Sequence, residues 1–248
     1  YVDELHVDGF RFDLAGILGE KDGDFNNWDD PANTVLQDII DDPVLRRYNT
    51  RIIAEPWTAG GNYGPLIGAY PASSDGQTGW LEWNARFRDW WRAFVNYDDW
   101  VLNSQEADAD GGFVLTAMQD TYNRNGRGPM SAVNFITAHD GFTMYDVVTY
   151  AHKRNGCTPL NPVCCDDPAS SWCEQDSGDD HNRSREWGAQ AEAFKRQLMR
   201  NFFTAMMIAH GTPMLLGGDE WMRTQLGNNN AYSTGSDNPY NWFRWGLW

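Results

Sequence analysis

Three short apolar runs in this chain lead into carboxylates. They are residues 7–13 (VDGFRFD), 52–57 (IIAEPW) and 135–140 (FITAHD), and the carboxylates are those of Asp13, Glu55 and Asp140. Such runs are typical of buried strands, and the C-terminal ends of parallel strands are where a barrel has its chemistry. Two carboxylates on neighbouring strands can cleave a glycosidic bond. A third carboxylate beside a histidine, here His139, can hold the sugar.

The elements that would position these carboxylates alternate between apolar strands and amphipathic helices, as in βαβ units. We expect strands at residues 4–12, 50–54, 80–83, 130–138 and 212–217, and helices at residues 33–41, 85–97 and 186–210. Five strands cannot close a (β/α)8 TIM barrel, which needs eight. The sequence therefore predicts an α/β fold that is the C-terminal part of such a barrel, about strands 4 to 8. Residues 1–248 would be one partial catalytic domain, with a cysteine-containing loop insertion at about residues 152–185.

Composition and charge restrict the partners. Of the 248 residues 41% are hydrophobic, which is enough for a core, and the formal net charge is −16. This charge argues against a nucleic acid or an anionic membrane surface as partner and favours a neutral or cationic ligand. The chain has 13 Trp, many of them beside Gly, Asn or Asp. Exposed indole faces suit carbohydrate, although any single Trp can instead fill the core.

The start of the chain says nothing about the cellular compartment, and only four cysteines bear on it. The chain begins at Tyr1 without Met or a leader, and no apolar run reaches the length of a membrane span. Because it opens on the approach to a strand, we expect it to be a piece of a longer protein. The cysteines, which allow three pairings, are Cys157, Cys164, Cys165 and Cys173. A disulfide-stapled loop in a secreted protein is favoured over zinc binding. It is also favoured over reduced thiols, and reduced thiols in a cytoplasmic protein stay the alternative.

Several segments resemble the α-amylase superfamily of glycoside hydrolases (family 13). Residues 9–13, 53–57 and 136–140 are similar to its second, third and fourth signature regions, in the same order. Residues 7–15, 211–220 and 227–232 resemble one branch, the isoamylase and glycogen-debranching enzymes. The resemblance covers nearly the whole chain except the cysteine-containing insertion. It implies a retaining hydrolase acting on α-glucan.

The resemblance also implies roles for the residues. Asp13 would be the nucleophile that forms a covalent glycosyl-enzyme, and Arg11, on the same side of the strand, would keep Asp13 ionised. Glu55 would be the general acid and then the base, helped by a pKa that apolar neighbours raise. Retention then requires the two carboxyl groups to lie roughly 5–5.5 Å apart. Asp140 would be the third catalytic carboxylate and, with His139, would hydrogen-bond the sugar and stabilise the oxocarbenium-like transition state. The substrate-binding residues would be Arg11, Trp57 and His139.

The residues after Asp13 bear on the bond that is cleaved. Many α-amylases have a Lys-His pair there, whereas residues 14–18 read LAGIL. This departure favours α-1,6 branch linkages of glycogen and amylopectin. Open alternatives are an α-1,4-glucanase, a pullulanase, a trehalose-releasing enzyme and a non-catalytic glucan-binding homologue. The first signature region and most calcium ligands of relatives are expected before Tyr1. We therefore assign no cofactor or metal to this chain, leave calcium to the full-length protein, and expect the chain alone to be inactive.

Each residue also has a purely structural interpretation. Asp13 and Arg11 could be an ion pair at a strand end, and Glu55 a loop carboxylate. His139 and Asp140 could cap a turn in which a following glycine has a positive φ. A last pair, Asp219 and Glu220, is expected to brace a loop rather than to act in catalysis. The joint occurrence of the carboxylates at strand ends favours the catalytic interpretation of the first three sites.

Overall fold

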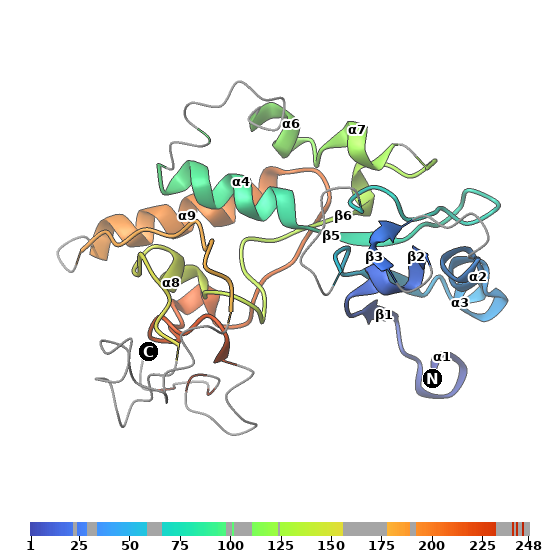
Figure 1. Ribbon diagram of the computed structural model, residues 1–248, viewed down its shortest axis with the longest axis horizontal. Helices are drawn as coiled ribbons and strands as arrows, with labels where there is room; N and C mark the ends of the chain where they lie inside the picture. Colours follow the sequence, from blue (N-terminus) through green and yellow to red (C-terminus); the bar gives the residue numbers. More distant parts are fainter. Residues whose placement is uncertain are drawn as a thin grey trace. The chain divides into compact units, whose positions relative to one another are not determined.

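A computed structural model (Figure 1) describes residues 1–21, 24–28, 34–58, 66–97, 101, 111–123, 125–155, 178–188, 192–231, 240, 242 and 245. The chain divides into two compact units. The first unit consists of Tyr1–Ala85, Asp110–Asn134 and Ile208–Pro213. The second unit consists of Arg86–Ala109, Phe135–Met207 and Met214–Trp248. All four cysteines and most of the predicted insertion lie at residues 156–177, outside the described residues.

A parallel sheet forms the centre of the first unit. Among the described residues it has five strands, in the order β1 (Gly9–Phe12), β4 (Arg51–Ala54), β5 (Leu81–Asn84), β6 (Ala132–Asn134) and β7 (Thr212–Pro213). Every neighbouring pair in this order is parallel. A separate antiparallel pair joins β2 (Glu20–Lys21) to β3 (Asp24–Trp28). The predicted α/β class with parallel strands is confirmed.

The register of the sheet decides which side chains share a face. Arg11 pairs with Ile53, and Ile53 pairs with Leu81, so these three residues share a face. Side chains alternate along a strand, and Trp83, two residues after Leu81, therefore belongs to the same face. Gly9 is required at the start of β1, because a Cβ there would lie 2.7 Å from the carbonyl oxygen of Arg51.

The opposite face of the sheet packs into the core. Ile52 and Ala54 of β4 are buried in one cluster with Leu36, Tyr70 and Trp80. The indole N–H of Trp80 donates to the carbonyl oxygen of Leu36 at 3.0 Å, so even this large ring has its polar group satisfied. The helices of the first unit are α1 (Val2–Leu5), η1 (Ala15–Gly19), α2 (Val35–Asp41), α3 (Pro43–Arg47), α6 (Gly111–Leu115), α7 (Gln119–Tyr122) and η3 (Pro129–Ser131).

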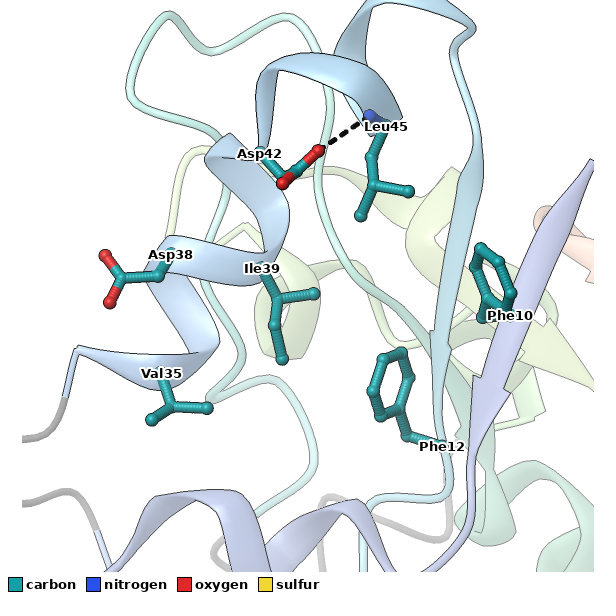
Figure 2. Close-up of a pocket in the computed structure, with 7 residues that line it drawn as sticks. All are labelled: Phe10, Phe12, Val35, Asp38, Ile39, Asp42 and Leu45. Atoms are coloured by element: carbon teal, nitrogen blue, oxygen red, sulfur yellow. Dashed lines mark hydrogen bonds between the residues drawn. The ribbon is translucent and has the colours of Figure 1, made fainter. Parts of the chain in front are cut away.

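A groove of about 460 Å³ lies between β1 and the two helices α2 and α3 (Figure 2). Its apolar wall comes from both sides, with Phe10 and Phe12 on the strand and Ile39 and Leu45 on the helices. Asp42 at its edge caps α3, because its carboxylate accepts from the backbone N–H of Leu45 at 3.0 Å. The groove thus marks where helix and strand side chains pack incompletely.

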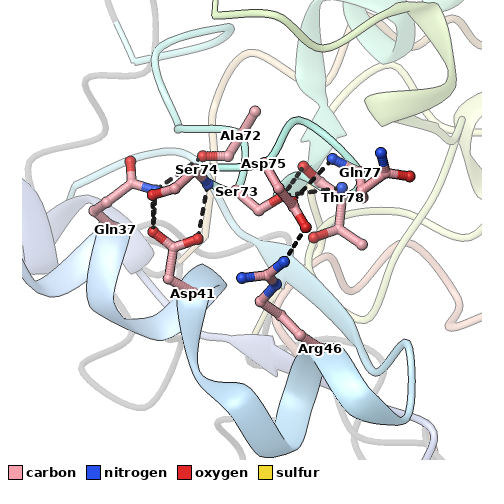
Figure 3. Close-up of polar contacts among 9 residues, drawn as sticks. All are labelled: Gln37, Asp41, Arg46, Ala72, Ser73, Ser74, Asp75, Gln77 and Thr78. Atoms are coloured by element: carbon pink, nitrogen blue, oxygen red, sulfur yellow. Dashed lines mark hydrogen bonds and ion pairs between the residues drawn. The ribbon is translucent and has the colours of Figure 1, made fainter.

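Polar contacts fasten α2 and α3 to the loop before β5 (Figure 3). Asp41 accepts from the backbone N–H of Ser74 at 2.8 Å and from its hydroxyl, and these bonds lower the pKa of Asp41. Gln37 donates to Asp41 at 2.8 Å, and Arg46 forms an ion pair with Asp75. The loop is therefore held to the helices by charged groups at the surface.

The second unit contains the two longest described helices, α4 (Ala85–Val95) and α9 (Glu192–Ile208), with Ala85 and Ile208 counted in the first unit. Its described residues also form the short helices α8 (Met144–Val147) and η6 (Asp219–Trp221). The helix predicted at residues 85–97 is present as α4, and in it the rings of Trp90 and Phe94 stack with their centroids 4.9 Å apart. No helix within the described ranges has the length and apolar character needed to cross a bilayer.

Several predicted boundaries are wrong. Residues 2–5 form α1 rather than the start of a strand; Asp3 and Glu4 in its first turn favour a helix N-terminus, and left-handed His6 ends it. The predicted strand at residues 130–138 is reduced to β6 after η3, and that at 212–217 to β7. Residues 186–188 are not helical, because Gly188 has a φ of 74°. Helix α9 starts only at Glu192.

Candidate active site

The guanidinium of Arg11 bridges two carboxylates in the first unit. Its Nη1 lies 2.8 Å from Oδ1 of Asp13, and its Nη2 lies 2.8 Å from Oε1 of Glu55. The two carboxylates differ in exposure, since 70% of the Asp13 side chain is exposed and only 2% of the Glu55 side chain. One cation therefore holds together an accessible carboxylate and a buried one.

Backbone hydrogen bonds fix Glu55 at the end of β4. Its N–H donates to the carbonyl oxygen of Phe12 at 3.0 Å, which continues the β1–β4 pairing. The backbone N–H of Leu14 donates to Oε2 of Glu55 at 2.7 Å. Leu14 has a φ of 43° and a ψ of 45°, a left-handed conformation that costs a residue with a side chain about 1–2 kcal/mol. This conformation directs the Leu14 N–H at the Glu55 carboxylate.

The surroundings of Glu55 push its pKa in opposite directions. Burial raises the pKa of Glu55 to about 7, from an ordinary value of 4.5. The Leu14 N–H and the Arg11 charge oppose this rise, whereas the charge of Asp13 and a hydrogen bond with its carboxyl add to it. A carboxyl group with a pKa near 7 can both donate and accept a proton at neutral pH, as a general acid and base must.

Two tryptophans lie beside this pair of carboxylates. Trp83 of β5 faces Arg11, with the guanidinium carbon 4.3 Å from the ring centroid. Trp57, two residues after Glu55, has its ring 6.1 Å from that of Trp83. Trp57 is half-buried and Trp83 is buried, so of these two rings Trp57 has the larger exposed surface to offer a ligand.

The segment after Asp13 turns sharply into η1. Ala15 and Gly16 are buried, and a Cβ on Gly16 would lie 2.8 Å from the carbonyl oxygen of Trp57. The N–H of Ala15 also donates to the carbonyl oxygen of Glu55 at 3.0 Å. Among positions 14–18, where many α-amylases have a Lys-His pair, Ala15 and Gly16 are thus small residues packed against the backbone that follows β4.

His139 and Asp140 lie together in the second unit. Nε2 of His139 is 3.5 Å from Oδ2 of Asp140, and 46% and 45% of their side chains are exposed. Gly141 follows with a φ of 85°, as the turn interpretation of this sequence predicts. Its N–H donates to the carbonyl oxygen of Asn229 at 2.9 Å. The two polar side chains therefore stand on a tight turn that a distant loop holds in place.

Buried polar groups brace this turn. Nε of Arg92 on α4 donates to the carbonyl oxygen of Ile136 at 2.8 Å. Asp219 accepts from the Thr137 hydroxyl and from the Met144 N–H at 2.9 Å, and burial raises the pKa of Asp219 to about 6. Asp219 is 1% exposed, which agrees with its predicted bracing role.

The structure thus brings Arg11, Asp13 and Glu55 into contact, and places His139 beside Asp140. Sequence reasoning missed Trp83 and the Leu14 N–H. The parallel register puts Trp83 on the face of Arg11, but that register depends on pairing between distant segments. Among the described residues, no three His, Cys, Asp or Glu side chains cluster as a metal site requires.

No family model matches the chain. It is 36% identical over 247 residues to the glycogen operon protein GlgX homolog of Haemophilus influenzae, covering 99% of this chain and 34% of that protein. It is 37% identical over 252 residues to isoamylase 3, chloroplastic, of Oryza sativa subsp. japonica, covering 99% and 28%. The chain spans about a third of the length of such relatives.

Solved structures show the same fold. The type I pullulanase of Bacillus subtilis complexed with maltose matches 99% of this chain and 28% of its own, with a TM-score of 0.58 and 21% identity. A pullulanase from Anoxybacillus matches 99% and 28%, with a TM-score of 0.57 and 19% identity. The sequence matches cover nearly every residue, including the carboxylate-bearing strand ends. The chain belongs to the isoamylase and glycogen-debranching branch of the α-amylase superfamily.

Proposed function

We propose that the protein is a glycoside hydrolase that cleaves α-1,6 branch linkages of glycogen and amylopectin with retention of configuration. The observation that carries this proposal is the pair Asp13 and Glu55, joined by Arg11 and opposite in exposure. An exposed carboxylate beside a buried one with a pKa near 7 supplies a nucleophile and a proton donor. The isoamylase and glycogen operon names of the relatives support the same substrate class.

In the first step the Asp13 carboxylate attacks the anomeric carbon while Glu55 gives its proton to the leaving glycosidic oxygen. A glycosyl ester on Asp13 forms, and the aglycone leaves with a hydroxyl group. In the second step the Glu55 carboxylate takes a proton from water, and the resulting nucleophile attacks the anomeric carbon and frees Asp13. Two inversions give net retention. Arg11 stabilises both carboxylates while they are charged.

Substrate contacts complete the proposal. Trp57 would stack on a sugar ring, and His139 and Asp140 would form hydrogen bonds with sugar hydroxyls. The fold is proposed to be the C-terminal part of a TIM barrel, about strands 4 to 8, supported by five parallel strands in sequence order among the described residues. We propose no cofactor for these residues and leave calcium to the full-length protein.

Two points of the proposal depend on the relatives alone. The pullulanase fold matches make pullulan the nearest competing substrate. The name of the rice isoamylase, chloroplastic, supports a location inside the cell, whereas the secreted location favoured by the sequence depends on cysteines outside the described residues. Neither point changes the roles proposed for Asp13 and Glu55.

Digestion of three glucans tests the function. The full-length protein is incubated with amylopectin, linear amylose and pullulan, and new reducing ends and chain lengths are measured. We expect linear chains from amylopectin and little release from amylose; preferential cleavage of pullulan would favour a pullulanase. Asp13→Asn and Glu55→Gln should each lower the rate by about 10²–10⁴-fold. Asp38→Asn, on the surface of α2, is the matched control and should leave the rate unchanged.

A further inference from the structure

Trp83 lies against the cation that joins the two carboxylates. The guanidinium carbon of Arg11 is 4.3 Å from the Trp83 ring centroid, which is within the range of a cation–π interaction. Trp83 is 7% exposed, so the contact is largely shielded from water. A shielded cation–π contact is stronger than an exposed one, and it favours particular orientations of the guanidinium.

The orientation of the guanidinium matters because both of its terminal nitrogens are used. Nη1 reaches Asp13 and Nη2 reaches Glu55, each at 2.8 Å. A planar fork serves two carboxylates in this way only while its plane is fixed. Asp13 is largely exposed, so its end of the fork is held less firmly than the end at buried Glu55. The ring of Trp83 lies next to Trp57 at 6.1 Å, and this contact helps to hold the indole itself.

We propose that Trp83 is a positioning residue, whose indole holds the Arg11 guanidinium in the orientation that bridges Asp13 and Glu55. The consequence for catalysis rests on the proposed function, whereas the consequence for the titration of Glu55 does not. Trp83 acts through Arg11 and has no contact with the reacting atoms in this scheme.

Loss of the indole face has a definite electrostatic consequence. The charge of Arg11 favours the ionised form of Glu55, so a guanidinium that turns away lets the pKa of Glu55 rise further. We expect a rise of about half a unit or more in Trp83→Leu. The basic limb of the pH–rate profile should move to higher pH by the same amount. The value of kcat should fall by about 10- to 100-fold with a smaller change in KM, because misplaced groups slow the chemical step.

Four variants separate positioning from packing. Trp83→Leu and Trp83→Met remove the aromatic face, and Met keeps more of the side-chain volume. Trp83→Phe retains a face and should restore a pKa near that of the wild type. Trp80→Phe is the matched control, because Trp80 packs on the other face of the sheet against Phe12 and Tyr70. It should lower thermal stability without moving the pKa of Glu55.

The measurement is a pH titration of the Glu55 carboxyl carbon by NMR in protein labelled with 13C-glutamate, assigned with Glu55→Gln. A raised pKa in folded Leu or Met variants, and a nearly normal pKa in Trp83→Phe, supports the proposal. An unchanged pKa in the folded Leu or Met variant, or an equal shift in Trp83→Phe, overturns it. Failure of the wild type to debranch amylopectin would reject the proposed function, and the titration would still decide the role of Trp83.

Discussion

Arg11 and Glu55 are joined across two parallel strands by an ion pair of 2.8 Å, and Asp13 shares the same guanidinium. Glu55 is buried and Asp13 is exposed, so one cation connects carboxylates in very different environments. Burial is the largest cause of the raised pKa of Glu55, and the charge of Arg11 limits the rise. The difference between the two carboxylates therefore originates in their positions at the ends of β1 and β4.

Replacement of Arg11 by lysine should disrupt this arrangement although the charge is kept. An ammonium group has no planar fork and cannot bridge two carboxylates in the same way. We expect kcat/KM on amylopectin to fall by about 10²-fold in Arg11→Lys. Arg47, the last residue of α3, lies over the ring of Tyr48. Arg47→Lys is the control and should leave kcat/KM unchanged. Normal turnover by Arg11→Lys would show that the bridge is dispensable.

The raised pKa of Glu55 predicts a pH-dependent stability. In the unfolded chain this group has a pKa near 4.5, and in the folded chain the pKa is about 7. Between these two values the folded state keeps a proton that the unfolded state loses. The stabilising contribution of protonated Glu55 to folding is therefore fully present below about pH 4.5. It is lost as the pH rises through 7, and amounts to on the order of 3 kcal/mol. Urea unfolding from pH 5 to 8 should show a smaller downward slope for Glu55→Gln than for the wild type; equal slopes would contradict the prediction.

Leu14 provides a test of backbone geometry beside the carboxylates. Its φ of 43° would be strained for valine, whose side chain is β-branched. The same φ would be easier for asparagine, which is found in this conformation more often. Leu14→Val should therefore be less stable than Leu14→Asn by about 1–2 kcal/mol in chemical denaturation. The valine variant should also lose activity, since its N–H no longer points at Glu55. Equal stabilities of the two variants would mean that the left-handed conformation is not required.

A buried ion pair elsewhere in the first unit predicts a large loss of stability. Glu82 and Arg127 are paired at 2.6 Å and almost fully buried, and burial raises the pKa of Glu82. Arg127→Met leaves that carboxylate unpaired and should cost about 3–5 kcal/mol. Addition of Glu82→Gln should recover much of this loss. A lower pH should also stabilise Arg127→Met, because protonated Glu82 carries no charge to bury.

The exposed pair Arg46–Asp75 is the matched comparison for this prediction (Figure 3). Both of its side chains are more than one-third exposed, and exposed pairs contribute at most about 1 kcal/mol. Arg46→Met should therefore cost far less than Arg127→Met in the same urea titration. Similar losses would show that burial does not distinguish the two pairs.

Local sequence patterns predicted the central strands and the helix α4 well. In residues 51–54 buried side chains alternate with more exposed ones, as expected for a strand. The aromatic spacing in α4 fits a helical period. The ends of elements were less accurate. Val2–Leu5 became a helix and residues 186–188 stayed outside α9, because a left-handed His6 and Gly188 end the regular backbone there. Single backbone conformations of this kind are weakly encoded in apolar periodicity.

The site residues that lie close together in the sequence were predictable. Arg11 and Asp13, two residues apart, and His139 with Asp140 were found directly from spacing. Trp83 was not found, because its contact with Arg11 depends on the register of β1, β4 and β5. The Leu14 N–H was missed because a side-chain pattern does not reveal a backbone donor. Long-range pairing and backbone direction are therefore the information that the sequence patterns lacked.

The central claim is that Asp13 is the nucleophile of a pair whose proton donor is Glu55. A slow fluorinated α-glucosyl fluoride can trap the covalent intermediate, and mass spectrometry of proteolytic peptides then locates the sugar. The account predicts an ester-linked sugar on the peptide that contains Asp13, with no adduct in Asp13→Asn. A sugar attached to another residue, or no adduct in a preparation that debranches amylopectin and turns over this reagent, would contradict it.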